Sequence, residues 1–182
     1  MGVKETYNSI AASWAQLKTK PLDFVINFLK HKKGKILFAG CGSARNSKYA
    51  SDKGFRVIGF DFSLEMVKQA RELDPRGEYF VADVRAIPIK NKAFNNAVCA
   101  STLHHLTPVN VVKALKELKR VANKSLISVW NHPTLKGEHL IKWGEHERYY
   151  FLYGHDEFLN LLKQVFKEFK EVKARDNFIF IT

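Results

Sequence analysis

The chain has 182 residues, 46% of them hydrophobic, and this length and composition suit one compact domain with its own core. Lysine and arginine number 30 against 18 aspartates and glutamates; the resulting net charge of +12 favours a polyanionic partner such as nucleic acid, the alternative being a solvated lysine-rich surface. No apolar run reaches membrane-span length, the N-terminus lacks a signal-peptide core, and Cys41 and Cys99 do not suit a disulfide framework, so we expect a cytoplasmic protein with no membrane association.

The first 33 residues are predicted to form two helices. Apolar side chains recur at helical spacing over residues 4–17, and Pro21 is placed to open a second helix. From residue 34 onward, short apolar strands alternate with amphipathic helices, which predicts an α/β fold with a parallel sheet covered on both faces. The strands are expected at 35–39, 55–60, 78–82, 94–100 and 125–130, and the helices at 44–53, 63–73 and 108–122.

The C-terminal part is predicted to complete the same domain. Residues 131–147 are rich in Gly, His and Lys, and we expect an irregular loop over the site. An aromatic strand at 149–153, a helix at 155–167 and a hairpin with strands 168–174 and 177–182 follow. We therefore predict one domain over residues 1–182, with helices at 1–33, a ligand-binding core at 34–131 and a loop, helix and hairpin at 132–182.

A glycine turn follows the first predicted strand. Gly40, Cys41 and Gly42 separate the strand from a helix, and glycines let a backbone approach a ligand where a Cβ would collide. The helix N-terminus adds unpaired N–H groups. Asp61 ends the second strand, where a carboxylate can accept hydrogen bonds from both hydroxyls of a ribose. A glycine turn alone also fits a simple packing turn, but the glycine turn together with Asp61 indicates a nucleoside site.

Further polar residues stand at the expected carboxyl ends of the next strands. Asp83 follows the third strand, and Ser101 leads from the fourth strand to His104 and His105. Ligands of open parallel sheets bind at these ends, where the strand order reverses. No histidine or cysteine spacing matches a metal site, so we expect no metal.

This ordered set, over residues 34–131, resembles the class I S-adenosylmethionine-dependent methyltransferases. The resemblance implies a Rossmann-like fold, a seven-stranded mostly parallel sheet with an antiparallel C-terminal hairpin strand, and S-adenosylmethionine as cofactor. It implies that the glycine turn packs on the methionine part, that Asp61 binds the ribose, and that Asp83 contacts the adenine amino group with Val84 beside the ring. The implied cofactor residues are Gly40, Cys41, Gly42, Asp61, Phe62, Asp83, Val84 and Ser101. The chain departs from the family at Phe38, usually acidic, and at Ala44, usually glycine.

Further segments add to this set: Tyr7–Ala11, Lys18–Pro21, the pair His104-His105, Trp130, Arg148–Tyr153 and Arg175–Phe178. Together they resemble more narrowly the tRNA wobble-uridine methyltransferases, which esterify the carboxylate of 5-carboxymethyluridine in the anticodon loop. The resemblance implies a minimal, archaeal-type member of that family. An ionised carboxylate needs no general base, only in-line placement and groups that orient an anion. The expected substrate-orienting residues are Lys18, His104, His105, Arg148 and Arg175. Tyr149 and Tyr150 are candidates to stack on a base, although alternate rings of their strand are expected in the core.

Two other functions stay open at this point. One is a small-molecule methyltransferase of the same fold, which the charge of +12 disfavours. The other is a catalytically silent RNA-binding or scaffold subunit, which the departure at Phe38 keeps in view. The third strand is expected at the sheet edge, and its apolar run Tyr79–Val81 suggests a partner. Related enzymes imply a small zinc-binding activator subunit there; coverage by a helix or self-association are the alternatives.

Overall fold

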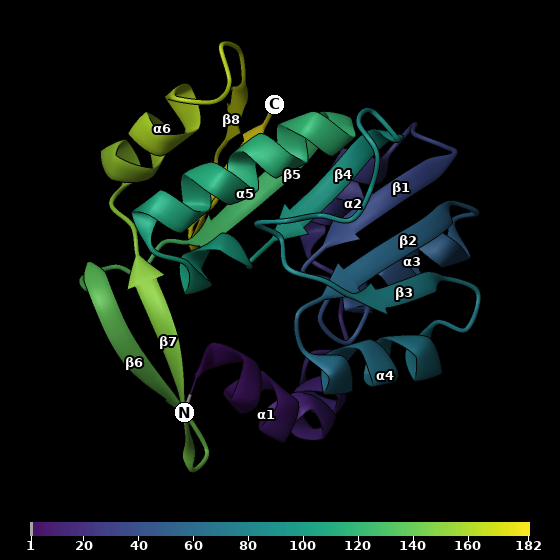
Figure 1. The fold of residues 1–182 in the computed structure, drawn as a ribbon, viewed down its shortest axis with the longest axis horizontal. Coiled ribbons are helices and arrows are strands. Elements are labelled where there is room, and N and C mark those ends of the chain that lie inside the picture. The colour runs from purple at the N-terminus through teal and green to yellow at the C-terminus, as the bar shows by residue number, and fades with distance from the viewer. Residues whose placement is uncertain (1) are drawn as a thin grey trace.

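The computed structural model describes residues 2–182. A seven-stranded sheet runs through it in the order β3-β2-β1-β4-β5-β9-β8 (Figure 1). The first five strands are parallel, and β9 and β8 join as an antiparallel hairpin, as the resemblance implied. The strands are β1 (Lys35–Ala39), β2 (Arg56–Asp61), β3 (Glu78–Val81), β4 (Phe94–Ala100), β5 (Ala122–Trp130), β8 (Lys170–Val172) and β9 (Asn177–Ile181). The strand order reverses at β1, between β2 and β4.

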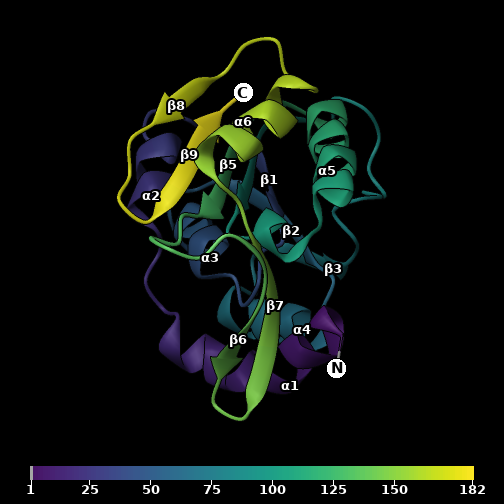
Figure 2. The ribbon, with the colours of Figure 1, turned by 90° about the vertical axis from the view of Figure 1, so that its left-hand side faces the viewer.

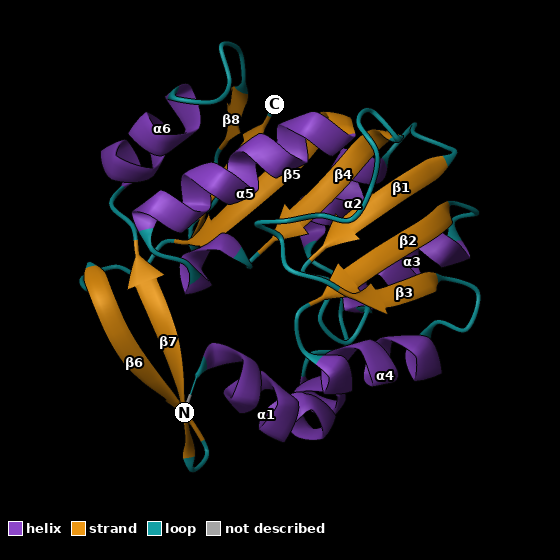
Figure 3. Ribbon diagram, viewed as in Figure 1, coloured by secondary structure: helices purple, strands orange, loops and turns teal. Residues whose placement is uncertain are grey.

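Helices cover both faces of the sheet (Figure 3). Strand β1 shows why, since Leu37 and Ala39 belong to the core beneath α5 and α6, whereas Ile36 and Phe38 belong to the core beneath α2 and α3. A parallel strand buried on both faces is apolar throughout. The helices are α1 (Val3–Leu17), α2 (Asp23–Leu29), α3 (Arg45–Asp52), α4 (Leu64–Leu73), α5 (Pro108–Val121) and α6 (His155–Lys163), with a 3₁₀ turn η1 (Leu103–His105).

The segment expected to be an irregular loop is instead mostly a β-hairpin. Strands β6 (Gly137–Trp143) and β7 (His146–Leu152) pair antiparallel around the two-residue turn at Gly144, whose φ is 58°. The prediction was wrong because β6 alternates between half-buried and exposed residues, so its sequence carries little apolar periodicity. The aromatic strand therefore begins at residue 146, three residues before the expected start.

Helix α1 packs against the β6–β7 hairpin at one end of the sheet (Figure 2). The Thr6 hydroxyl donates to the Glu147 carbonyl at 3.1 Å, and the Trp143 indole N–H donates to the Ser13 hydroxyl at 3.3 Å. The rings of Trp14 and Trp143 lie 4.8 Å apart. These contacts join segments more than 120 residues apart in the sequence. Within residues 2–182, no helix is both long enough and apolar enough to cross a membrane.

Candidate active site

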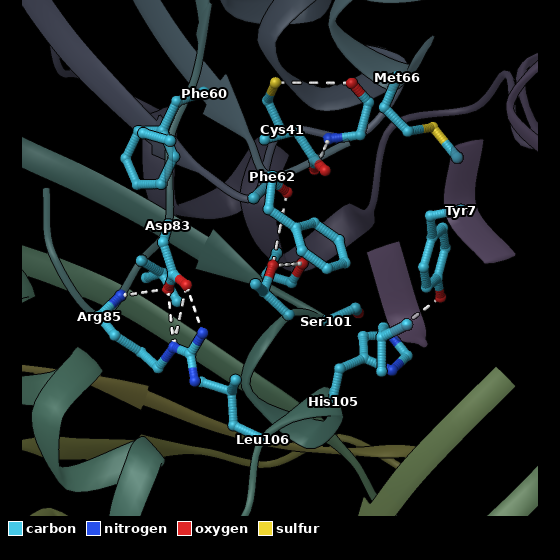
Figure 4. A pocket seen from close by; sticks show the side chains of 18 of the residues that line it. Tyr7, Cys41, Phe60, Phe62, Met66, Asp83, Arg85, Ser101, His105 and Leu106 are labelled. Carbon is cyan, nitrogen blue, oxygen red and sulfur yellow. Dashed lines mark hydrogen bonds and ion pairs between the residues drawn. The ribbon is translucent and has the colours of Figure 1, made fainter. Parts of the chain in front are cut away.

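A pocket of about 300 Å³ lies at the carboxyl ends of β1, β2, β3 and β4 (Figure 4). This is the point where the strand order reverses, which is where open α/β sheets bind ligands. Tyr7 and Trp14 of α1 form the opposite wall. All eight residues expected to bind the cofactor line this pocket: Gly40, Cys41, Gly42, Asp61, Phe62, Asp83, Val84 and Ser101. Their roles toward a bound cofactor remain predictions.

The glycine turn has a conformation that excludes most side chains at Gly40. Its φ is 70°, and a Cβ there would lie 2.2 Å from the Thr102 hydroxyl oxygen. Gly42 also has a positive φ, of 53°. Ala44 has a φ of 71°, although the left-handed region costs an alanine roughly 1–2 kcal/mol. Position 44, where the family usually has glycine, thus keeps a left-handed backbone conformation that is typical of glycine.

Phe38 takes no part in the pocket. Its side chain is 2% exposed and packs in the core beneath α2 and α3. A carboxylate at this position would be buried among apolar groups and would need a partner. The acid usual in the family is therefore replaced by a core residue, and any polar contact to the cofactor's amino end must come from another residue.

The Asp61 carboxylate joins the ends of β1 and β2. One oxygen accepts a hydrogen bond from the Gly42 N–H at 2.9 Å, and the other accepts one from the Ser63 N–H at 3.1 Å. Burial raises the pKa of this carboxyl from 3.8 to about 6, against the opposing effect of backbone hydrogen bonds. The group is therefore mainly ionised at neutral pH and can accept hydrogen bonds from ribose hydroxyls.

The Asp83 carboxylate is held by its neighbour Arg85. The Arg85 Nε lies 3.0 Å from both oxygens and Nη2 lies 2.5 Å from Oδ2 (Figure 4). Partial burial raises the pKa of Asp83, but the hydrogen bonds from Arg85 outweigh it and leave the pKa below its ordinary value. The carboxylate is thus charged and fixed in orientation.

Of the five residues expected to orient the substrate, His105 lines the pocket. Its Nδ1 lies 2.7 Å from the Tyr149 carbonyl oxygen, so Nδ1 carries the proton and Nε2 accepts from the Tyr7 hydroxyl at 2.9 Å. Burial and the Arg148 charge lower the pKa of His105 to about 4. The imidazole is therefore neutral at physiological pH, and both its nitrogens are engaged.

His104 has a different position. Its Nδ1 accepts the Trp130 backbone N–H at 3.0 Å, and its ring lies 5.0 Å from that of Tyr150, outside the pocket lining. Burial, with the neighbouring His105 and Arg148, lowers its pKa well below 6.5. Of the two histidines, His104 supports the end of β5 and His105 faces the pocket.

Arg148 is a buried cation beside the pocket. The residue is 8% exposed. Its guanidinium lies 5.5 Å from the Trp14 ring, 5.0 Å from the Trp143 ring and 5.2 Å from the Tyr150 ring. It donates to the Tyr150 hydroxyl at 2.7 Å, while its Nε has no hydrogen-bond partner. Within residues 2–182 no carboxylate forms an ion pair with it. A buried charge without a counter-ion is costly.

Two expected substrate residues lie elsewhere. The Lys18 ammonium follows the end of α1 and lies 5.7 Å from the Trp14 ring and 5.6 Å from the Trp143 ring, on the outer side of the pocket wall. The Arg175 side chain is 96% exposed in the β8–β9 turn and belongs to a second groove. Tyr149 lines the pocket, whereas Tyr150 is buried behind it, so the two rings alternate as expected for a strand.

Several pocket residues are not among those expected from the sequence, and four of them are Tyr7, Trp14, Thr102 and Arg45. Helical spacing places Tyr7 and Trp14 only on the apolar stripe of a helix, and no motif singles out Thr102. Arg45, the first residue of α3, also lines the pocket, and within residues 2–182 it pairs with no carboxylate. Burial lowers its pKa. Its place directly after the glycine turn was the available signal. Among residues 2–182, no three His, Cys, Asp or Glu side chains are grouped closely enough to hold a metal ion.

Comparisons with known proteins agree with this geometry. Residues 36–125 match the methyltransferase domain family. The chain is 32% identical to the tRNA (carboxymethyluridine(34)-5-O)-methyltransferase of Saccharomyces cerevisiae over 70% of this chain and 47% of that protein. It is also 32% identical to the malonyl-[acyl-carrier protein] O-methyltransferase of Pseudescherichia vulneris, over 60% of this chain and 43% of that protein. The chain thus spans less than half the length of these relatives.

Solved structures share the fold. A S-adenosylmethionine-dependent methyltransferase of Methanosarcina mazei has a TM-score of 0.72 at 19% identity, over 88% of this chain and 97% of that one. A methyltransferase of Haloferax volcanii, solved with its Trm112 activator, has a TM-score of 0.75 at 14% identity, over 99% of this chain and 96% of that one. The chain therefore carries a methyltransferase domain over residues 36–125 and has the class I S-adenosylmethionine-dependent methyltransferase fold.

Proposed function

We propose that this chain methylates a carboxylate, that of 5-carboxymethyluridine at the tRNA wobble position. The observation that carries the proposal is Arg148, a buried cation with an unpartnered Nε and no acidic partner in residues 2–182. It lies directly behind Tyr7 and Trp14, which line the pocket. A substrate carboxylate reaching this cation would supply the missing counter-ion and be held by charge-assisted hydrogen bonds.

The protonation states near Arg148 suit a substrate that needs no base. His105 is neutral, and its Nε2 already accepts a hydrogen bond from the Tyr7 hydroxyl. Burial, together with Tyr150, raises the pKa of Tyr7 well above 10, so a tyrosinate is not available as a base. A carboxylate with an ordinary pKa of about 4 is ionised at neutral pH, so it can attack without losing a proton. Placement then supplies much of the rate.

The pocket residues fit S-adenosylmethionine. When bound, this cofactor supplies a methyl group already activated on a sulfonium. We assign Asp61 to the ribose hydroxyls, Asp83 with Val84 to adenine and the glycine turn to the methionyl chain, because all of them line the same pocket. We assign Arg45 to the methionyl carboxylate, because it is a cation at that end of the pocket without an acidic partner in the described chain.

The relatives' names support oxygen methylation of a carboxyl-bearing group. Carboxymethyluridine and the malonyl group both carry a carboxyl, and both names specify O-methyl transfer. The malonyl relative keeps a small-molecule acyl substrate as the second candidate. The net charge of +12 favours tRNA, since a polyanion gains from it and a small acyl group does not need it.

A small activator that adds a strand to β3 is a further part of the proposal. Strand β3 ends the sheet, and Val81 is 43% exposed. The Ala82 N–H bonds to the Asp61 carbonyl, so the backbone groups of Tyr79 and Val81 point outward. Arg71 donates to the Tyr79 carbonyl at 2.6 Å and covers part of this edge. The activator seen with the Haloferax volcanii neighbour supports a partner of this kind.

One experiment tests the reaction. The protein, with and without the Haloferax volcanii activator, is incubated with tRNA containing 5-carboxymethyluridine and methyl-labelled cofactor, and the labelled nucleoside is identified by mass spectrometry. We expect a base-labile methyl ester at the wobble position. Label at a base-stable ring nitrogen or carbon, or on malonyl-acyl carrier protein alone, would contradict the wobble assignment.

A further inference from the structure

A second groove lies on the face of the sheet opposite α5. Its cavity volume is about 590 Å³, and its walls are α2 and the β8–β9 hairpin, with β5 and β9 beneath. Figure 2 shows α2, β8 and β9 together on this flank. Apolar side chains such as Phe24 and Val172 form its surface, and four cations stand around it: Lys32, Lys124, Lys173 and Arg175.

These cations are poorly neutralised. Asp23 and Asp176 also line the groove, but within residues 2–182 no carboxylate pairs with Lys32, Lys124 or Lys173. Arg175 reaches Asp176 only at 4.0 Å. Burial, and then the positive charge of Lys124, lowers the pKa of Lys32. Like charges thus face one another across an apolar surface, which an elongated anion would relieve.

The strand directions align this groove with the active site. Asn177 pairs with Trp130 at the carboxyl end of β5, and the Asn131 N–H donates to the Asp176 carbonyl at 3.0 Å, so Arg175 stands at the active-site end. Lys124 stands at the opposite end of β5. The six residue steps between Lys124 and Trp130 span about 20 Å. An RNA strand places several phosphates over such a length.

We propose that this groove binds the phosphate backbone of the RNA that extends from the methylated nucleotide. The inference rests on the proposed tRNA substrate, and it assigns Lys32, Lys124 and Lys173 to phosphate contacts that anchor the RNA without reading its sequence. Arg175, remote from the pocket, belongs to the same surface. These four cations give part of the excess charge of the chain a role in binding.

The test compares two triple variants with equal loss of charge. One is Lys32→Gln with Lys124→Gln and Lys173→Gln. The control is Lys113→Gln with Lys116→Gln and Lys167→Gln, three exposed lysines of the α5–α6 side that form no ion pair within residues 2–182. Fluorescence anisotropy measures binding of an unmodified tRNA transcript over a salt series. For the groove variant we expect affinity to fall about tenfold or more and the log–log salt slope to weaken by about two to three units.

The control variant should lose clearly less on both measures, and calorimetry should give both variants the parental cofactor affinity. Equal losses in the two variants, or an unchanged slope in the groove variant, would overturn the proposal; an unchanged slope would point to an acidic protein as the occupant. RNA binding is read without methyl transfer. A groove that binds tRNA in a protein that leaves the wobble uridine unmethylated would refute the proposed reaction and not the groove.

Discussion

The two walls of the pocket are built in different ways. The cofactor wall comes from the ends of four neighbouring strands, where each polar residue directly follows an apolar strand. The substrate wall comes from α1, η1 and the β6–β7 hairpin, which are far apart in the sequence and adjacent only in the folded chain. For example, the Tyr7 hydroxyl is hydrogen-bonded to His105, 98 residues away in the sequence. A wall made of strand ends can carry a general cofactor, and a wall made of distant segments can be changed for a particular substrate.

The largest effect on the cofactor wall is expected from Asp61→Ala. This change removes a ribose acceptor and leaves the Gly42 and Ser63 N–H groups without their partner. Loss of charged hydrogen bonds of this kind weakens binding by about 100-fold. Titration calorimetry with S-adenosylmethionine measures the loss, and circular dichroism checks that the variant is folded. Parental affinity would remove Asp61 from the site.

The matching change on the substrate wall is Arg148→Met. We expect kcat/KM for the carboxylate substrate to fall about 100-fold, because a charge-assisted contact is lost, while cofactor affinity stays at the parental value. Thermal stability should stay unchanged or rise, since replacing a buried unpaired charge by an apolar side chain is often stabilising.

Activity and thermal melting are therefore measured on the same Arg148→Met sample. A variant that loses activity and stability together would mark Arg148 as a structural residue. Arg148→Lys serves as a control that keeps the charge but not the fork of donors, and it should recover part of the activity.

The pH dependence of cofactor affinity should again distinguish the cofactor wall from the substrate wall. The pKa of Asp61 is raised to about 6, so at pH 5 only about a tenth of this group is ionised, and cofactor affinity should fall about tenfold below its value at pH 8. His105, with a pKa lowered to about 4, stays neutral throughout this range and adds nothing to the change. Calorimetry from pH 5 to 8 measures the midpoint, and Asp61→Asn should abolish the dependence.

At saturating cofactor, kcat should be flat from pH 6.5 to 9. A carboxylate substrate is fully ionised there and no side chain of the pocket has to accept a proton. A rise of kcat with a midpoint between these limits would indicate a general base and would favour an amine or hydroxyl substrate over the carboxylate.

The same contrast explains what the sequence could predict. Gly40, Asp61 and Asp83 each follow a recognisable strand, so periodicity and spacing alone place them near one another. Arg148 could be suspected only from the family resemblance, and its surroundings, which are aromatic rather than acidic, come from α1 and the β6–β7 hairpin. Strand β6 was missed because it alternates between half-buried and exposed residues and so has little apolar pattern, whereas β7, which buries one face, was largely predicted as the aromatic strand.

Arg175 shows the opposite failure. Its place in the sequence fitted the family's pattern, but the β8–β9 turn carries it along the flank of the sheet rather than into the pocket. Motif position identifies a residue's neighbours in the chain, and only strand order and direction decide which end and which face of the sheet it reaches.

The smallest effect is expected at Ala44, where the cofactor wall itself departs from the family. Its φ of 71° is unfavourable for alanine, so Ala44→Gly should relieve strain of roughly 1–2 kcal/mol. The greater freedom of glycine in the unfolded chain offsets about 0.4–1 kcal/mol, which leaves a small net gain in stability. Urea unfolding measures it, with Ala50→Gly in α3, a helical alanine, as the destabilising control. A loss of stability at position 44 would show that the buried methyl group contributes more through packing than its backbone conformation costs.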